Sequence, residues 1–245
     1  MTEPLLSVHE LDVRFGGLAA LSGVGFHMRA GEILGIVGPN GAGKTTLFNA
    51  LVGVQRPTAG SILFQGRGIS GLKPHVIARL GMTKTFQNSA LFPEMSVLEN
   101  VCTAALLHHR LAAAKKKAYG ILERLELFDI AGEDVANLTF PQKALTELAR
   151  AMATDPKILL LDEVMAALSH EEMDGVIAVI RRLREDDGIG FIVIEHHMRA
   201  ILSLCDRLLV LSFGQVIAEG DPGEVVRHPD VIKAYLGDSA GAGHA

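Results

Sequence analysis

The chain has 245 residues, of which 49% are hydrophobic and 21% are charged, enough apolar material for one large α/β domain or two small ones. Its net charge of −5, with no basic block longer than Lys115–Lys117, argues against a nucleic-acid-binding protein. No apolar run is long enough to span a bilayer and the first residues do not resemble a signal peptide, so we expect a cytosolic protein.

Short apolar runs alternate with helical patterns along the chain, which is typical of a parallel sheet covered by helices. The first and last strands read as shorter and more polar than the others, which favours a small antiparallel layer beside a mostly parallel sheet. Strands are predicted at Leu6–Leu11, Val24–Met28, Ile33–Val37, Ser61–Phe64, Gly81–Thr85, Ile158–Leu161, Phe191–Ile194, Leu208–Leu211 and Val216–Glu219. Helices are predicted after Lys44, Pro74, Ser96, Lys115, Gln142, His170, His197 and Pro222.

The stretch from about residue 88 to residue 150 differs from the rest because its pattern is almost purely helical. Its middle, from Ala112 to Glu133, is charged and amphipathic. This pattern predicts a helical subdomain inserted between two sheet-forming parts of one α/β domain that covers residues 1–237. Residues 238–245 are mostly small residues and are predicted to form a flexible tail.

Residues 38–46 read GPNGAGKTT and match the pattern G-x-x-x-x-G-K-[ST], whose backbone N–H groups surround phosphate oxygens. The predicted strand Ile33–Val37 precedes the motif and a helical run follows it, a context that a chance glycine-rich turn would lack. Lys44 can place a positive charge at the terminal phosphates, and the Thr45 hydroxyl can bind Mg²⁺. The predicted nucleotide contacts are Gly38, Pro39, Asn40, Gly41, Ala42, Gly43, Lys44, Thr45 and Thr46.

Two carboxylates, Asp162 and Glu163, end the predicted strand Ile158–Leu161. A buried parallel strand delivers its last residues to the crevice at the carboxyl edge of the sheet, where ligands bind. There Asp162 can hold the hydration shell of Mg²⁺ opposite Thr45, and Glu163 can polarise the attacking water. The alternative is that both acids only begin the next helix, where negative charge is favoured.

Two polar residues at other strand ends are candidates for the same site. His196 closely follows the strand Phe191–Ile194, and a neutral imidazole there can donate to a γ-phosphate and sense its loss. The alternative for His196 is an ordinary histidine with satisfied hydrogen bonds. Gln87 follows the strand Gly81–Thr85, and its amide can bind Mg²⁺ or orient water while nucleotide is present.

The motifs GPNGAGKTT, TFQ, ILLLDE and IEH occur in this order and resemble those of ATP-binding cassette (ABC) subunits of membrane transporters. The resemblance runs from Leu6 to about Gly237. The segments VRFGGLAAL, TFQNSALFPEMSVLENV, VIEHHM and HPDVIKAYLG are similar to ATPase subunits of importers for branched-chain or hydrophobic amino acids, a subfamily that also serves urea, amides and some organic acids. The resemblance implies a P-loop NTPase fold and places Phe15 where an aromatic ring stacks on adenine; the alternative is a strand-end core residue.

The signature motif departs from the family pattern. The family signature LSGGQ begins a helix that caps the γ-phosphate of the ATP held by the other subunit, but residues 138–142 read LTFPQ. Thr139 can replace the serine hydroxyl, whereas Phe140 and Pro141 replace both glycines and Pro141 has no backbone N–H. The resemblance still assigns nucleotide contacts in trans to Leu138, Thr139 and Gln142.

From the resemblance we expect an ATPase that uses ATP and Mg²⁺, with Thr45, Gln87 and Asp162 at the metal, on the cytoplasmic face of the cell membrane as a peripheral subunit. Its expected partners are two membrane permease subunits, a second ABC ATPase subunit and, indirectly, an external solute-binding protein. The altered signature favours a heterodimer with a paralogue. The expected cargo is branched-chain amino acids or a related small polar or organic solute; the alternative function is a regulatory or degenerate subunit that holds nucleotide with little turnover.

The helical insertion is also expected to carry the contact with the membrane subunits. Three apolar side chains, Leu91, Phe92 and Met95, cluster in a short loop there, which indicates a partner surface if they are exposed. The alternative is that they pack the insertion onto the sheet.

Overall fold

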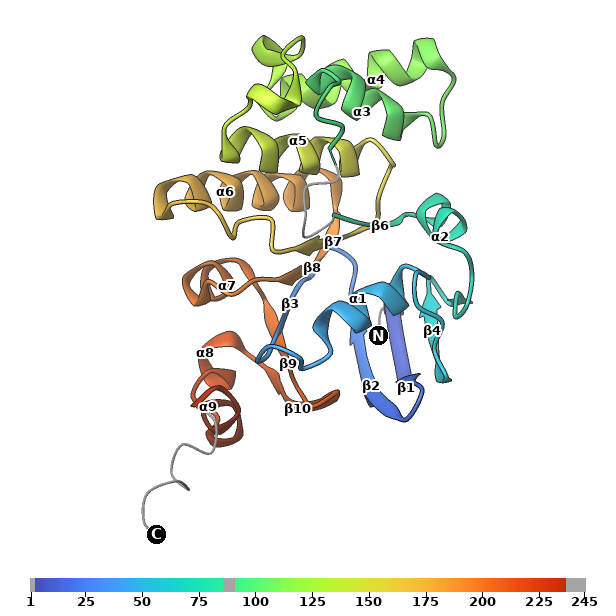
Figure 1. Ribbon diagram of the computed structural model, residues 1–245, viewed down its shortest axis with the longest axis vertical. Coiled ribbons are helices and arrows are strands. Elements are labelled where there is room, and N and C mark those ends of the chain that lie inside the picture. Colours follow the sequence, from blue (N-terminus) through green and yellow to red (C-terminus); the bar gives the residue numbers. More distant parts are fainter. Residues whose placement is uncertain (1–2, 86–90, 237–245) are drawn as a thin grey trace.

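The computed structural model describes residues 3–85 and 91–236, and its centre is a six-stranded sheet of order β10-β9-β3-β8-β7-β6 (Figure 1). The inner strands are buried on both faces, which explains why they read as continuous apolar runs. β10 (Gln215–Gly220) pairs antiparallel with β9 at one edge. The other strands run parallel: β3 (Ile33–Val37), β6 (Met82–Lys84), β7 (Ile158–Asp162), β8 (Gly190–Ile194) and β9 (Arg207–Ser212).

A second sheet of order β2-β1-β4-β5 is antiparallel and consists of β1 (Leu6–Phe15), β2 (Leu18–Met28), β4 (Ala59–Phe64) and β5 (Arg67–Gly68). The prediction of a short first strand was wrong, since β1 extends to Phe15. A register shift after Val8 and the positive φ of Glu10 interrupt the alternation of buried and exposed residues, which hid the second half of the strand. The last strand, β10, joins the central sheet rather than the antiparallel layer.

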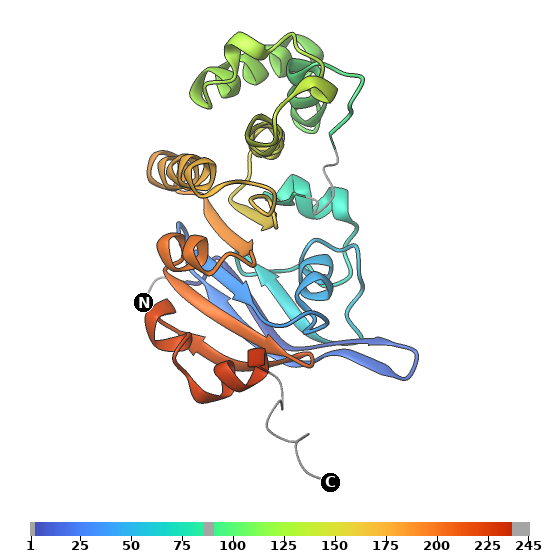
Figure 2. The ribbon, with the colours of Figure 1, turned by 60° about the vertical axis from the view of Figure 1, so that its left-hand side comes forward.

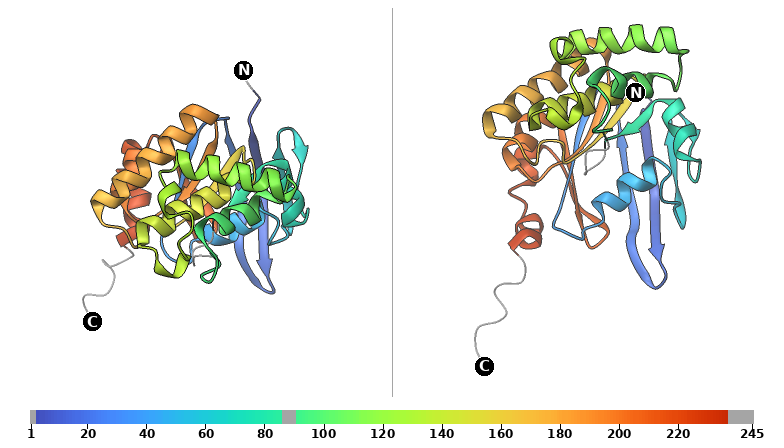
Figure 3. Two further views of the ribbon diagram at one scale, coloured as in Figure 1. Left: turned by 90° about the horizontal axis from the view of Figure 1, so that it is seen from above. Right: turned by 45° about the horizontal axis from the view of Figure 1, so that its top comes forward.

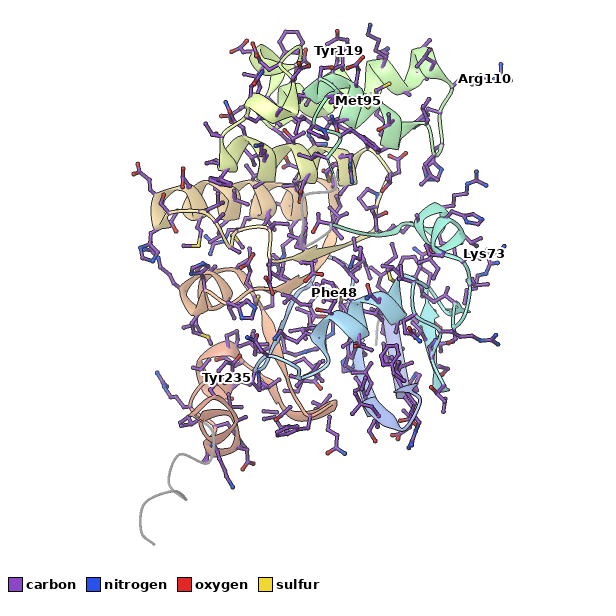
Figure 4. The ribbon with its side chains drawn as sticks, in the orientation of Figure 1. Phe48, Lys73, Met95, Arg110, Tyr119 and Tyr235 are labelled. Carbon is purple, nitrogen blue, oxygen red and sulfur yellow. The ribbon has the colours of Figure 1, made fainter. Side chains whose placement is uncertain are left out.

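Helices cover both faces of the central sheet. α1 (Lys44–Leu51) lies between the two sheets, where Phe48, labelled in Figure 4, is fully buried among residues of β1, β3 and β9. The opposite face carries α6 (His170–Asp187), α7 (Met198–Leu204), α8 (Pro222–Val225) and α9 (Pro229–Leu236), as Figure 1 shows. α2 (Pro74–Leu80) precedes the edge strand β6. α9 and the two-residue strand β5 were not predicted.

A group of helices lies at one end of the molecule, away from the antiparallel sheet (Figures 2 and 3). It contains α3 (Val97–Ala105), α4 (Leu111–Arg124), the 3₁₀ turns Phe128–Ile130 and Val135–Asn137, and α5 (Phe140–Met152). α4 begins four residues before Lys115 and ends earlier than the amphipathic pattern indicated, because Glu126 adopts a positive φ. Within residues 3–85 and 91–236, no helix has the length and apolar content needed to cross a membrane. The predicted tail, 238–245, lies outside the described residues.

The predicted architecture is confirmed: a mostly parallel sheet, a small antiparallel layer and a helical insertion form one α/β fold. The sheet order matters for the site. β3 has β9 on one side and β8, then β7, on the other. Residues that follow these four strands therefore share one edge of the sheet, with the loop after β3 in the middle.

Candidate nucleotide site

The loop between β3 and α1 holds the motif GPNGAGKTT, and its shape requires glycine at defined positions. Gly38 has φ +153°, and a Cβ there would lie 2.1 Å from the Leu211 carbonyl oxygen of β9. Gly43 has φ +105° immediately before α1, and a Cβ there would lie 2.8 Å from the Ala20 carbonyl oxygen of β2. The loop is therefore pressed against β9 and β2, and only glycine allows the backbone to turn there.

Lys44 begins α1 and its side chain is buried. Its Nζ donates to the carbonyl oxygens of Gly38, at 2.7 Å, and of Pro39, at 3.2 Å, so the ammonium folds back over the loop. Burial lowers the pKa of Lys44, while the nearby carboxylates of Glu163 and Asp162 oppose that shift. The ammonium group of Lys44 is thus hydrogen-bonded to neutral backbone carbonyls. Anionic phosphate oxygens are stronger acceptors and would replace these carbonyls as its partners.

A pocket of about 470 Å³ opens beside this loop. Phe15 lines it with 50% of its surface exposed, so the alternative that Phe15 is a buried core residue is wrong. Gly38 and Pro39 lie behind the lining, where they contact β9 and Lys44. The predicted residues that line the pocket are Phe15, Asn40, Gly41, Ala42, Gly43, Lys44, Thr45, Thr46, Glu163 and His196.

Asp162 is the last residue of β7 and is 2% exposed. The alternative that it begins a helix is wrong, since the next helix starts at His170. Its Oδ2 lies 3.5 Å from Nζ of Lys84, and its buried Oδ1 has no hydrogen-bond partner among the described residues. Burial raises the pKa of Asp162, partly offset by Lys84. A buried carboxylate oxygen without a donor suits a hydrated divalent cation, which takes oxygen ligands.

Glu163 and His196 come from adjacent strands and meet at the pocket. Nε2 of His196 and Oε1 of Glu163 are 2.7 Å apart. Glu163 adopts a positive φ of 56°, and its N–H donates to the Ile194 carbonyl at 2.9 Å. A non-glycine residue with a positive φ carries backbone strain, which persists only where the surrounding structure fixes that conformation. Here the hydrogen bond to Ile194 of β8 fixes it. The result is a carboxylate aimed into the pocket with an imidazole hydrogen-bonded to it.

Glu195 was missed by the sequence reasoning, although it directly precedes His196. It is 3% exposed, and its Oε1 accepts a hydrogen bond from the Met165 N–H at 2.8 Å. Its Oε2 is buried without a partner in the described part of the chain. Burial raises the pKa of Glu195 to about 7. This carboxyl links the end of β8 to the turn that carries Glu163. The sequence did contain a signal for Glu195, since an acidic residue directly follows the apolar strand Phe191–Ile194.

Glu195 should make stability depend on pH. Its pKa in the folded protein is raised above the ordinary value of 4.5, so its protonation stabilises the fold at low pH and that contribution is lost as pH rises through about 7. Glu195→Gln resembles the protonated form and cannot ionise. We expect it to increase the free energy of unfolding by about 3 kcal/mol at pH 8 and to change it little at pH 5, measured by denaturant unfolding. An equal effect at the two pH values would contradict this explanation.

Leu138, Thr139 and Gln142 do not line the pocket. Gln87 falls outside the described residues. Thr139 precedes α5 and forms a capping box, in which its N–H donates to Gln142 Oε1 at 2.9 Å and its hydroxyl accepts from the Gln142 N–H at 3.5 Å. Phe140 is 65% exposed, whereas Leu138 is buried. The helix start is therefore intact, but the structure does not bring Leu138, Thr139 and Gln142 to the phosphate loop of the same chain.

Comparisons with known proteins place the chain in a family. Residues 21–166 match the family described as ABC transporter, and residues 215–241 match the one described as branched-chain amino acid ATP-binding cassette transporter. The chain is 38% identical to the high-affinity branched-chain amino acid transport ATP-binding protein BraF of Pseudomonas aeruginosa, with 98% of this chain and 100% of the relative covered. The high-affinity branched-chain amino acid transport ATP-binding protein LivG of Escherichia coli is also 38% identical, over 98% of this chain and 100% of its own length.

A solved structure agrees. The ADP conformation of an ATP-binding cassette of an ABC transporter superposes with a TM-score of 0.89 at 29% identity, covering 97% of this chain and 100% of that one. The resemblance that the motifs indicated is thus confirmed. The chain belongs to the ABC transporter family, as one of its ATP-binding cassettes.

Proposed function

We propose that this cassette hydrolyses ATP to power an importer of branched-chain amino acids or of a related small polar or organic solute. Cassettes of its family are ATPases that power transport. The names of its relatives and the match over residues 215–241 support the solute class. The observation that carries the proposal is the meeting of Lys44, Glu163 and His196 at one pocket beside the phosphate loop.

ATP lies between Phe15 and the loop of residues 38–46 in this proposal. Backbone N–H groups of the loop and Nζ of Lys44 bind the phosphates. Two oxygens of the described residues fit Mg²⁺: the Thr45 hydroxyl and, through water, the unpartnered Oδ1 of Asp162. The Gln87 amide, the third ligand predicted from the sequence, lies outside the described residues. Mg²⁺ bound there would supply positive charge to the phosphates. Among the residues that the structure describes, no group of three or more acidic, histidine or cysteine side chains could hold a metal ion.

Catalysis then depends on positioning rather than on covalent chemistry. Glu163 accepts a hydrogen bond from the attacking water and draws its proton away. Nε2 of His196 lies 2.7 Å from Oε1 of Glu163. A neutral imidazole has one N–H, so His196 donates it to Glu163 without nucleotide and to the γ-phosphate when ATP is bound. The strained backbone at Glu163 keeps the carboxylate directed into the pocket. The signature residues Leu138, Thr139 and Gln142 act on the nucleotide of a partner subunit.

Two permease subunits, a second cassette and an external solute-binding protein complete the proposed importer, with this chain on the cytoplasmic face of the membrane. A cavity of about 490 Å³ between α3, α5 and β6 suits the contact with a permease. Phe92 lines it, half exposed, with the guanidinium carbon of Arg150 5.8 Å from its ring centre. Leu91 is buried, so the predicted apolar cluster is divided: Leu91 packs inward and Phe92 faces out.

The test is reconstitution of the complete importer in liposomes, with solute uptake and ATP hydrolysis measured together. We expect hydrolysis to be stimulated by the solute-loaded binding protein. Phe92→Asp should reduce uptake at least tenfold while the isolated subunit stays folded, because Asn100 holds the backbone of residue 92 and the ring itself is half exposed. Leu111→Asp, an exposed apolar residue of the same subdomain outside the cavity, is the matched control. Uptake that survives Phe92→Asp, or unfolding of the variant, would contradict the docking assignment.

A second candidate function is supported by one observation. α5 begins with an exposed Phe140 and with Pro141, which has no N–H to offer a γ-phosphate. A subunit that holds nucleotide with little turnover of its own is therefore the rival. ATPase measurements with the cognate partner distinguish the two functions.

A further inference from the structure

Phe213 occupies a backbone position that disfavours it. The hairpin between β9 and β10 is a two-residue turn, Phe213-Gly214, since Ser212 pairs directly with Gln215. Both turn residues have positive φ, 46° for Phe213 and 78° for Gly214, as in the turns that favour Asn-Gly or Asp-Gly. Asparagine and aspartate tolerate this conformation, whereas a bulky aromatic residue is strained there.

No packing within the described chain compensates for this strain. The side chain of Phe213 is 92% exposed, the highest exposure among the large apolar residues of the described segments. Local rules that a sequence breaks without a visible structural gain tend to mark functional positions. The compensation therefore has to come from a molecule that contacts Phe213.

The turn is fastened to the nucleotide pocket. The Gly214 N–H donates to the Ala42 carbonyl of the phosphate loop at 3.0 Å, and the Ser22 N–H of β2 donates to the Gly214 carbonyl at 2.9 Å. Phe213 lines the same pocket of about 470 Å³ as Phe15 and Leu18, which are 50% and 68% exposed. Three apolar side chains from the β1–β2 and β9–β10 turns thus stand around one pocket.

The sheet order shows which end of the pocket this is. β9 lies on one side of β3, whereas β8 and β7, which carry His196 and Glu163, lie on the other. The phosphate loop follows β3 and lies between them. Apolar groups therefore gather on the β9 side and polar groups on the β8 side. A nucleotide with its phosphates at Lys44 and its γ-phosphate near Glu163 would place its nucleoside toward Phe213 and Phe15.

We propose that Phe213 is a second aromatic contact for the nucleobase, in addition to Phe15; this rests on the proposed function of the pocket as an ATP site. An aromatic ring binds a base through its π-face without requiring a particular hydrogen-bond pattern. Burial of the Phe213 ring against the base offsets the strain of the turn. In this arrangement the ring contributes to affinity for nucleosides and nothing to the binding of phosphate alone.

The chain has no tryptophan, so a single introduced indole reports on its own position. Phe213→Trp and, separately, Phe15→Trp would be titrated as purified full-length chains with ATP and with inorganic tripolyphosphate. We expect ATP to change the fluorescence of both variants and tripolyphosphate to leave both nearly unchanged. A response of the Phe15→Trp variant to ATP without one from Phe213→Trp would overturn the inference and leave the ATP site standing.

Phe213→Asn gives effects of opposite sign. It restores the preferred Asn-Gly turn, so we expect the Tm to rise by about 2 °C. ATP affinity should fall about fivefold to tenfold, because a stacking contact is lost, while tripolyphosphate affinity stays unchanged. Unchanged ATP affinity with weaker association to a second cassette would make Phe213 a subunit contact and overturn the inference. Lys44→Ala that binds ATP as well as the wild type would overturn the nucleotide site itself.

Discussion

Glu163→Gln is expected to lower ATP turnover by about a hundredfold or more while ATP stays bound. Glutamine has the shape of glutamate but cannot take a proton from the attacking water. Its neighbours stay in place, because the N–H of residue 163 still donates to the Ile194 carbonyl and His196 can still hydrogen-bond to the amide oxygen. The measurement is single-turnover hydrolysis by the complex of this chain with its partner cassette, with ATP binding determined in parallel.

Lys44→Ala should have the reverse profile. Lys44 meets phosphates in the ground state, so its loss should weaken ATP binding before any chemistry takes place. The matched control for Glu163→Gln is Glu171→Gln, which replaces an exposed carboxylate at the start of α6 by the same amide. Normal turnover of Glu163→Gln in the presence of the partner would remove Glu163 from the proposed role.

The second large effect concerns the pairing of subunits. In this proposal each ATP lies on the phosphate loop of one cassette and under the signature of the other. In a homodimer both sites would meet the sequence LTFPQ, and both would lack the N–H that is absent at Pro141. The capping box of Thr139 and Gln142 preserves α5, so the missing N–H costs the helix little, since N–H groups in its first turn have no intrahelical partner. The loss therefore falls on the phosphate contact.

The loss of one oriented donor to a developing negative charge costs about 3 kcal/mol of transition-state stabilisation, a factor of about a hundred or more in rate. We therefore expect this chain to pair with a paralogue that has an intact signature. The competent site then uses Lys44, Asp162, Glu163 and His196 of this chain, and the second site mainly holds ATP.

The corresponding experiment compares two complexes that each carry one glutamate-to-glutamine change. Glu163→Gln in this chain should abolish most hydrolysis, and the matching change in the partner should matter much less. Pro141→Gly with Phe140→Gly, which restores two glycines, should raise the ATPase rate of this chain alone at least tenfold. Equal losses from the two single changes, or rapid hydrolysis by the unaltered homodimer, would show that the altered signature functions as it stands.

The phosphate loop and the apolar strands could be predicted because their signals are local. All five residues of β3, Ile33–Val37, are buried. Both ends of this strand were predicted correctly, because a strand covered on both faces is apolar throughout. The predicted length of β1 was too short, because a bulge interrupts the alternation of buried and exposed residues on which the prediction relied. β5 has two residues, too few to show a periodicity.

The side chains predicted for the site are adjacent to such local signals: Lys44 lies in its motif, and Asp162, Glu163 and His196 lie at the ends of apolar strands. The sequence places residues at strand ends, and parallel strands share an edge. What it does not contain is the order of the strands. The pairing of Glu163 with His196, the bond from Met165 to Glu195, and the gathering of Phe15 and Phe213 at one pocket depend on which strands are neighbours. That order is decided by long-range packing of two cores across the sheet, so only the tertiary structure could show these contacts.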